Sequence, residues 1–196
     1  MFSSSLIIWH LIQVSIFFHD HTERQWLVTT SSKLEISGST NVNRFHCLST
    51  DYTSADTLTE YFDPKTKTSV LEGTITLMAS NFDCHNEMTT RDFKKTLRTE
   101  NYPEVHIRFL QLKRKRQQKP ELTGIMEIII AGVSKRYPVT CLIKSAGNNE
   151  KHLEGTRSFK FSDFGLKPPD KLFGAIKVED NISVNFHLRL KALEHY

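Results

Sequence analysis

The chain has 196 residues, of which 38% are hydrophobic and 24% charged, with only 8 Gly and 6 Pro. This composition excludes a collagen-like or largely disordered chain, and the length suits one packed domain with its own core. The formal net charge of +4 is too small to indicate a nucleic-acid-binding protein.

Residues 1–22 are interpreted as a signal or leader segment, which leaves 23–192 as the folded domain. Residues 6–18 form a mostly apolar run, interrupted by His10 and Gln13. A membrane-spanning helix needs about 20 apolar residues, whereas a secretion signal needs roughly 7 to 15. No Lys or Arg precedes the run and no small-x-small cleavage site follows it, so a disordered leader is the alternative. We expect export, to the periplasm or outside the cell.

From Trp26 onward, apolar and polar residues alternate. The clearest case is residues 182–190, where five apolar side chains alternate with four polar ones. Such alternation predicts half-buried antiparallel strands, and no βαβ rhythm interrupts it. The pattern indicates an all-β protein and leaves open a sandwich or a closed barrel. The other predicted strands cover residues 33–36, 71–77, 104–109 and 139–143.

Residues 125–130 are apolar on both faces except for Glu127, which predicts a strand whose second face is covered by a helix. One helix is predicted to provide this cover. The segment Thr89-Thr90-Arg91-Asp92 has the spacing of a capping box, Phe93 and Leu97 follow on one face, and Tyr102-Pro103 ends the segment.

No motif in the chain argues for catalysis. Asp163-Phe164-Gly165 matches a kinase tripeptide, but the other kinase motifs are missing, so it is interpreted as a turn after a strand. The nine His residues contain no His-Glu-x-x-His motif, and the close pair, His19 and His21, lies in or beside the leader. Three others, His46, His106 and His187, are expected to face solvent, and no metal site is predicted.

Residues 113–119 form a basic run that is interpreted as a solvated hairpin loop. Lys113, Arg114, Lys115 and Arg116 offer a phosphate-binding site as the alternative. No aromatic residue is interleaved with these charges, so no nucleic-acid partner is predicted.

The three cysteines allow at most one intrachain disulfide. Cys141 alternates with Val139 and Ile143 on an apolar face, as expected of a buried thiol. If the chain is exported, Cys47 and Cys84 are the expected disulfide pair.

Six short segments, in this order, resemble the YceI-like family of bacterial envelope proteins. They lie at residues 32–45, 82–97, 102–107, 122–135, 162–166 and 178–190. The resemblance covers about residues 26–191. It implies a lipocalin-like, eight-stranded antiparallel barrel with one helical insertion, and it also supports the Cys47–Cys84 disulfide.

The resemblance further implies an apolar interior that binds an isoprenoid lipid, such as a prenyl pyrophosphate or an isoprenoid quinone, without catalytic residues or a cofactor. Strand alternation then gives the residues expected to line the tunnel. They are Val105, Ile107, Phe109, Met126, Ile128, Ile130, Val184, Phe186 and Leu188. A plain packed core is the alternative for each, because eight strands leave an interior just wide enough for side chains or one small ligand.

Three functions compete at this point. The first is a non-enzymatic lipid-binding or transport protein, and the second is a structural or interaction barrel with a filled core that acts through its surface loops. The third, an enzyme acting on a lipid-like substrate, has no residue constellation in its favour. An envelope partner fits the family, and the oligomeric state is open, a dimer included. The volume of the interior cavity distinguishes best between the first two.

Overall fold

The computed structural model describes residues 23–114, 119–171 and 175–193. Within them the chain forms twelve strands and one α-helix, α1 (Glu87–Thr96). The strands are β1 (Arg24–Val28), β2 (Lys33–Thr40), β3 (Arg44–Ser49), β4 (Thr57–Asp63), β5 (Thr68–Met78), β6 (Phe82–Asp83), β7 (Glu104–Arg114), β8 (Glu121–Ile130), β9 (Val133–Ser145), β10 (Glu150–Lys160), β11 (Asp170–Lys171) and β12 (Ile176–Ala192). Two 3₁₀ turns, η1 (Ala79–Asn81) and η2 (Phe161–Phe164), follow β5 and β10.

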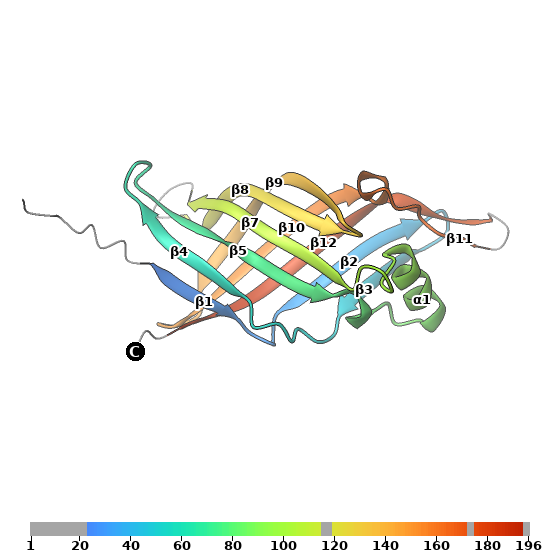
Figure 1. Ribbon diagram of the computed structural model, residues 1–196, viewed down its shortest axis with the longest axis horizontal. Helices are drawn as coiled ribbons and strands as arrows, with labels where there is room; N and C mark the ends of the chain where they lie inside the picture. Colours follow the sequence, from blue (N-terminus) through green and yellow to red (C-terminus); the bar gives the residue numbers. More distant parts are fainter. Residues whose placement is uncertain (1–22, 115–118, 172–174, 194–196) are drawn as a thin grey trace, which may run out of the picture.

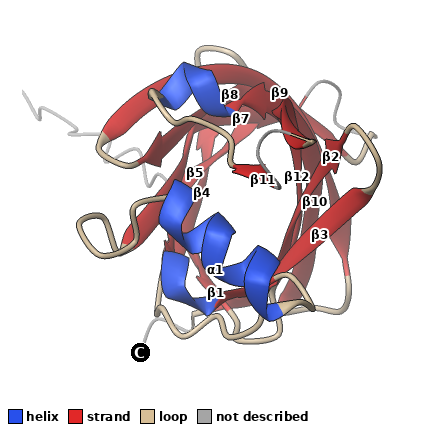
Figure 2. Cartoon of the chain, turned by 90° about the vertical axis from the view of Figure 1, so that its right-hand side faces the viewer, coloured by secondary structure: helices blue, strands red, loops and turns tan. Residues whose placement is uncertain are grey.

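The sheet closes on itself. Strands β1, β4, β5, β7, β8, β9, β10 and β12 pair in that order, and β12 returns to pair with β1. All pairings are antiparallel, and β12 is long enough to pair with β2 along one half and β1 along the other. Figure 2 looks along this ring, with α1 at the near opening. The expected all-β, eight-stranded antiparallel lipocalin-like barrel with one helical insertion is confirmed.

Strand alternation correctly predicted which side chains face the interior. In β12, Ile182, Val184, Phe186, Leu188 and Leu190 are all at most 4% exposed, whereas the residues between them are not buried. Because the side-chain period of a strand is two, a shift of one residue would place all five in water, which fixes the register against β2 and β10.

The helix begins three residues earlier than the capping-box prediction. Asn86 is the N-cap, and its side chain accepts a hydrogen bond from the Thr89 backbone N–H at 3.0 Å. Asn is as good an N-cap as Ser or Thr, so the capping-box spacing at Thr89 does not mark the start of the helix. The predicted apolar face is confirmed, because Phe93 and Leu97 are both 4% exposed.

The prediction that a helix covers the outer face of residues 125–130 is wrong. Helix α1 lies beside β6 at one end of the barrel (Figure 1), and Ile125 on the outer face of β8 is 40% exposed. Glu127 on that same face is 6% exposed because two arginines lie against it. Arg108 donates to one of its carboxylate oxygens at 2.9 Å and Arg136 to the other at 3.0 Å.

One prediction falls wholly, and another partly, on residues outside the described ranges. The leader, residues 1–22, lies entirely outside them, as do residues 115–118 of the basic run. Lys113 and Arg114 end β7 at the end of the barrel opposite α1 (Figure 1). Within the described part of the chain, no helix is both long and apolar enough to cross a bilayer.

Candidate functional site: an apolar interior and its opening

The interior next to α1 holds a narrow cavity lined entirely by apolar side chains. Its volume is about 20 Å³, which is room for about one water molecule. The lining residues are Leu34, Ile36, Leu77, Phe82, Phe93, Leu97, Val105, Ile107, Ile128, Ile130, Phe159, Phe161, Phe164, Leu166, Ile182 and Val184. The part of the interior next to α1 is therefore apolar along its surface and nearly filled by its own side chains.

The nine residues predicted to line a tunnel are all buried, and they divide into two groups. Five lie on the cavity: Val105, Ile107, Ile128, Ile130 and Val184. The other four, Phe109, Met126, Phe186 and Leu188, lie further from α1 and are 0–3% exposed. In this second group the rings of Phe109 and Phe186 meet with centroids 5.6 Å apart. These two rings, one from β7 and one from β12, occupy the interior beyond the cavity.

A glycine lets Phe186 fill this region. Gly155 on β10 is paired with Phe186 on β12, and a Cβ atom added at Gly155 would lie 2.3 Å from the ring Cζ. No side chain could stand there without moving the ring. Gly155 thus provides the room that the ring occupies between β10 and Phe109.

A second, larger hollow opens beside α1. This groove has a volume of about 250 Å³ and lies between the β2–β3 turn, α1 and the start of β12. Its lining residues are Thr40, Val42, Asn43, Arg44, Phe45, Thr89, Asp92, Phe93, Thr96, Phe161, Pro169, Ile176 and Val178. Phe93 and Phe161 line both the groove and the interior cavity, so these two rings stand between them.

Covalent and polar contacts fix the walls of the groove. A disulfide joins Cys47 of β3 to Cys84, which precedes α1, as predicted. On the opposite wall, the Asn41 side chain donates to the Ala175 carbonyl at 2.9 Å and accepts from the Lys177 backbone N–H at 3.0 Å. These contacts hold the helix near β3 and the β2–β3 turn against the start of β12.

Phe161 is held by the 3₁₀ turn η2. Asp163 accepts hydrogen bonds from the Lys160 backbone N–H at 3.1 Å and the Tyr137 hydroxyl at 2.9 Å. The backbone hydrogen bond, followed by the Tyr137 hydrogen bond, lowers the pKa of Asp163, which favours the charged carboxylate that accepts both hydrogen bonds. Gly165 ends η2 with a φ of 64°. The interpretation of Asp163-Phe164-Gly165 as a turn is confirmed.

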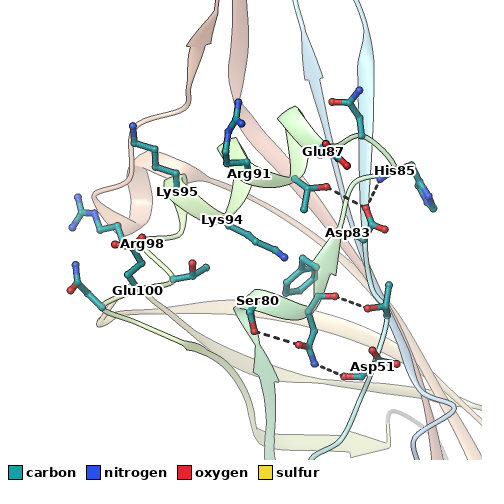
Figure 3. Close-up of a pocket in the computed structure, with 17 residues that line it drawn as sticks. Asp51, Ser80, Asp83, His85, Glu87, Arg91, Lys94, Lys95, Arg98 and Glu100 are labelled. Atoms are coloured by element: carbon teal, nitrogen blue, oxygen red, sulfur yellow. Dashed lines mark hydrogen bonds between the residues drawn. The ribbon is translucent and has the colours of Figure 1, made fainter.

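A polar cleft lies on the other side of α1 (Figure 3). It is open and has a volume of about 1130 Å³. Four cationic side chains, Arg91, Lys94, Lys95 and Arg98, and four carboxylates, Asp51, Asp83, Glu87 and Glu100, line it. Asp83 already accepts from the His85 backbone N–H at 2.8 Å. Phe82 lines both this polar cleft and the interior cavity.

Sequence reasoning missed the groove. Val42 and Phe45 were visible as apolar residues near a turn, but their contribution depends on the turn meeting α1 and β12, which are distant in sequence. The 68% exposure of Val42 marks an apolar side chain at the rim of the groove.

Comparison with protein families gives a match to the YceI-like domain over residues 21–190. The chain belongs to the YceI-like family. The match extends over nearly all of the residues that form the closed sheet and α1. No curated protein matches this YceI-like chain.

Solved structures share the fold at low sequence identity. BcnA of Burkholderia cenocepacia has a TM-score of 0.63 and 17% identity, over 83% of this chain and 98% of that one. A polyisoprenoid-binding domain from Saccharophagus degradans, implicated in plant cell wall breakdown, has a TM-score of 0.59 and 10% identity, over 86% and 98%. The Campylobacter jejuni YceI protein has a TM-score of 0.52 and 15% identity, over 74% and 84%. At these identities the likeness concerns the fold.

Proposed function

We propose that this YceI-like protein binds the apolar chain of an isoprenoid lipid, a prenyl pyrophosphate or an isoprenoid quinone, inside its barrel and acts as a non-enzymatic carrier or store. One observation carries the proposal: an interior cavity lined wholly by apolar side chains meets an open groove at two aromatic rings, Phe93 and Phe161. The solved neighbour described as a polyisoprenoid-binding domain supports the same ligand class.

The small cavity sets a condition on the ligand. Small-molecule sites usually measure about 300 Å³ or more, and opening that much space in a core costs about 7 kcal/mol at ~24 cal/mol per Å³. Each buried methylene contributes about 0.8 kcal/mol, so about nine of them offset the cost. Long isoprenoids should therefore enter by displacing side chains around the cavity, and a ten-carbon chain should bind weakly.

We place the lipid headgroup at the α1 end. Arg44 lines the groove, and Arg91, Lys94 and Lys95 line the neighbouring cleft without an ion-pair partner among the described residues. Cations of this kind bind phosphate oxygens through charge-assisted hydrogen bonds. These cations favour a diphosphate over a quinone, although the four carboxylates that line the same cleft oppose the binding of an anion. Exchange of Lys94 and Lys95 for Gln should weaken the binding of a prenyl pyrophosphate more than the binding of the matching prenyl alcohol.

Export to the periplasm or outside the cell is part of the proposal. The Cys47–Cys84 disulfide supports it, because disulfides persist in oxidising compartments. A partner in the cell envelope that loads or unloads the lipid, and a dimeric state, are compatible with this location.

Native mass spectrometry of the full chain tests the proposal with a matched pair of variants. Ile128 faces the cavity and is 1% exposed, whereas Ile125 on the same strand is 40% exposed on the outer face. Wild type and Ile125→Trp should each take up one long prenyl chain, and Ile128→Trp should take up none. Uptake by Ile128→Trp as strong as wild type would refute binding in the interior.

The nearly filled interior favours a second function, a structural or interaction barrel that works through its surface. In that case no prenyl chain binds wild type, and Phe93→Ala, which removes one ring between groove and cavity, does not change this. A carrier should instead take up the lipid faster after Phe93→Ala. The two functions are thus separated without relying on Ile128→Trp being folded.

A further inference from the structure

Two histidines and one glutamate meet on the outer face of the barrel, away from the apolar interior. Glu154 on β10 is paired with His187 on β12, and His152 lies two residues before Glu154 on the same face of β10. One ligand atom from each of the three residues lies within 4.8 Å of those from the other two. The sequence alone did not suggest this cluster, because His187 is 35 residues from His152 and only the strand register brings them together.

His187 has a ring nitrogen without a hydrogen-bond partner. Its Nε2 atom is shielded from solvent and bonds to no other described residue. Glu154 Oε1 is 3.7 Å away, which is beyond hydrogen-bond distance. The His152 and His187 rings meet edge to face with centroids 5.1 Å apart. A shielded polar atom without a partner is unfavourable, and a metal ion between these groups would satisfy it.

Glu154 is oriented for such a role. Its Oε2 atom accepts a hydrogen bond from Lys144 Nζ at 3.1 Å, while Oε1 is directed toward His187. Carboxylates that bind metals are commonly held in this way through their other oxygen. Lys33 on β2 is paired with His187, and Arg189 on β12 is paired with His152. These two positive charges limit the affinity of the site for a cation.

We propose that His152, Glu154 and His187 form a Zn²⁺ site on the outer face of the barrel. Two imidazoles and one carboxylate are a common donor set for zinc, with water at the fourth position. Ligand atoms about 2.1 Å from a tetrahedral zinc lie about 3.4 Å apart. The three ligand atoms now lie within 4.8 Å of one another, so modest side-chain rotation would bring them to that distance. The site does not depend on lipid binding.

Isothermal titration calorimetry of the full chain with ZnCl₂ tests this site. We expect one Zn²⁺ per chain, and a loss of affinity of at least tenfold in His152→Asn and in His187→Asn. His46→Asn is the matched control, because His46 also pairs with a glutamate, Glu35, at 2.8 Å, but without a second histidine. A double variant, His19→Asn with His21→Asn, should bind zinc as wild type does.

Unchanged zinc affinity in His152→Asn and His187→Asn, or loss of binding in the His19 and His21 variant, would overturn the proposal. Cobalt gives a second readout that does not depend on one variant. Co²⁺ bound at wild type should show the intense visible absorption of a four-coordinate site, and added Zn²⁺ should remove it. A weak, six-coordinate type of spectrum would equally contradict the proposed geometry. Circular dichroism of each variant checks that the sheet is retained.

Discussion

Phe186→Ala tests directly how the barrel interior is filled. The ring is 3% exposed, lies 5.6 Å from the Phe109 ring between centroids, and rests on Gly155, which has no side chain to fill a gap. Replacing a core Phe with Ala costs about 3–5 kcal/mol, so we expect a loss of about 4 kcal/mol in the free energy of unfolding. For a domain of this size that is a fall of about 8–16 °C in Tm.

Thermal and urea unfolding measure this change, with Phe62→Ala on β4 as the control. Phe62 is 47% exposed, so its loss should alter stability by less than about 0.5 kcal/mol. If Phe186→Ala costs less than about 1 kcal/mol, the ring does not fill the interior as described. The same variant should lengthen the cavity and, under the proposed function, shift the bound lipids toward longer chains.

Three further predictions concern the disulfide, a buried carboxylate and the free thiol. Exchange of Cys47 and Cys84 for Ser should cost about 4 kcal/mol in urea unfolding, from the chain entropy of a 37-residue separation, and a loss below about 1 kcal/mol would contradict this. The hydrogen bond from Arg136 lowers the pKa of Glu127, so its stabilisation is present above the unfolded-state pKa of about 4.3 and is lost as pH falls through the lowered folded value. The stability difference between wild type and Glu127→Gln should therefore shrink on acidification, and a constant difference would refute the assignment. Burial raises the pKa of Cys141 to about 12, so a thiol reagent should label it only after unfolding, and rapid labelling of the native protein would contradict its burial.

The sequence predicted well the features that depend on local alternation. The inward side of residues 182–190 follows from a period of two, and it needed no knowledge of the neighbouring strands. The buried face of α1 at Phe93 and Leu97 followed in the same way from helical spacing. The start of α1 was misplaced because Thr89 and Asn86 both carry side chains that can cap a helix.

Features that depend on which distant segments of the chain meet could not be predicted. The position of α1 at the end of the barrel, rather than over β8, is set by its contact with β6 and by the Cys47–Cys84 disulfide. The division of the interior into a cavity and a filled half depends on Phe186 meeting Gly155 across β10 and β12. Alternation shows that a side chain points inward, but not whether another meets it there.

Photo-cross-linking with a long polyprenyl chain that carries a diazirine tests the central claim most directly. The reagent should label the residues that surround the cavity, such as Ile128 on β8 and Val184 on β12, together with Phe93 on α1. An excess of unlabelled prenyl chain should compete with this labelling. Labelling restricted to the outer face of the sheet, or none above background at saturating reagent, would contradict lipid binding in the barrel.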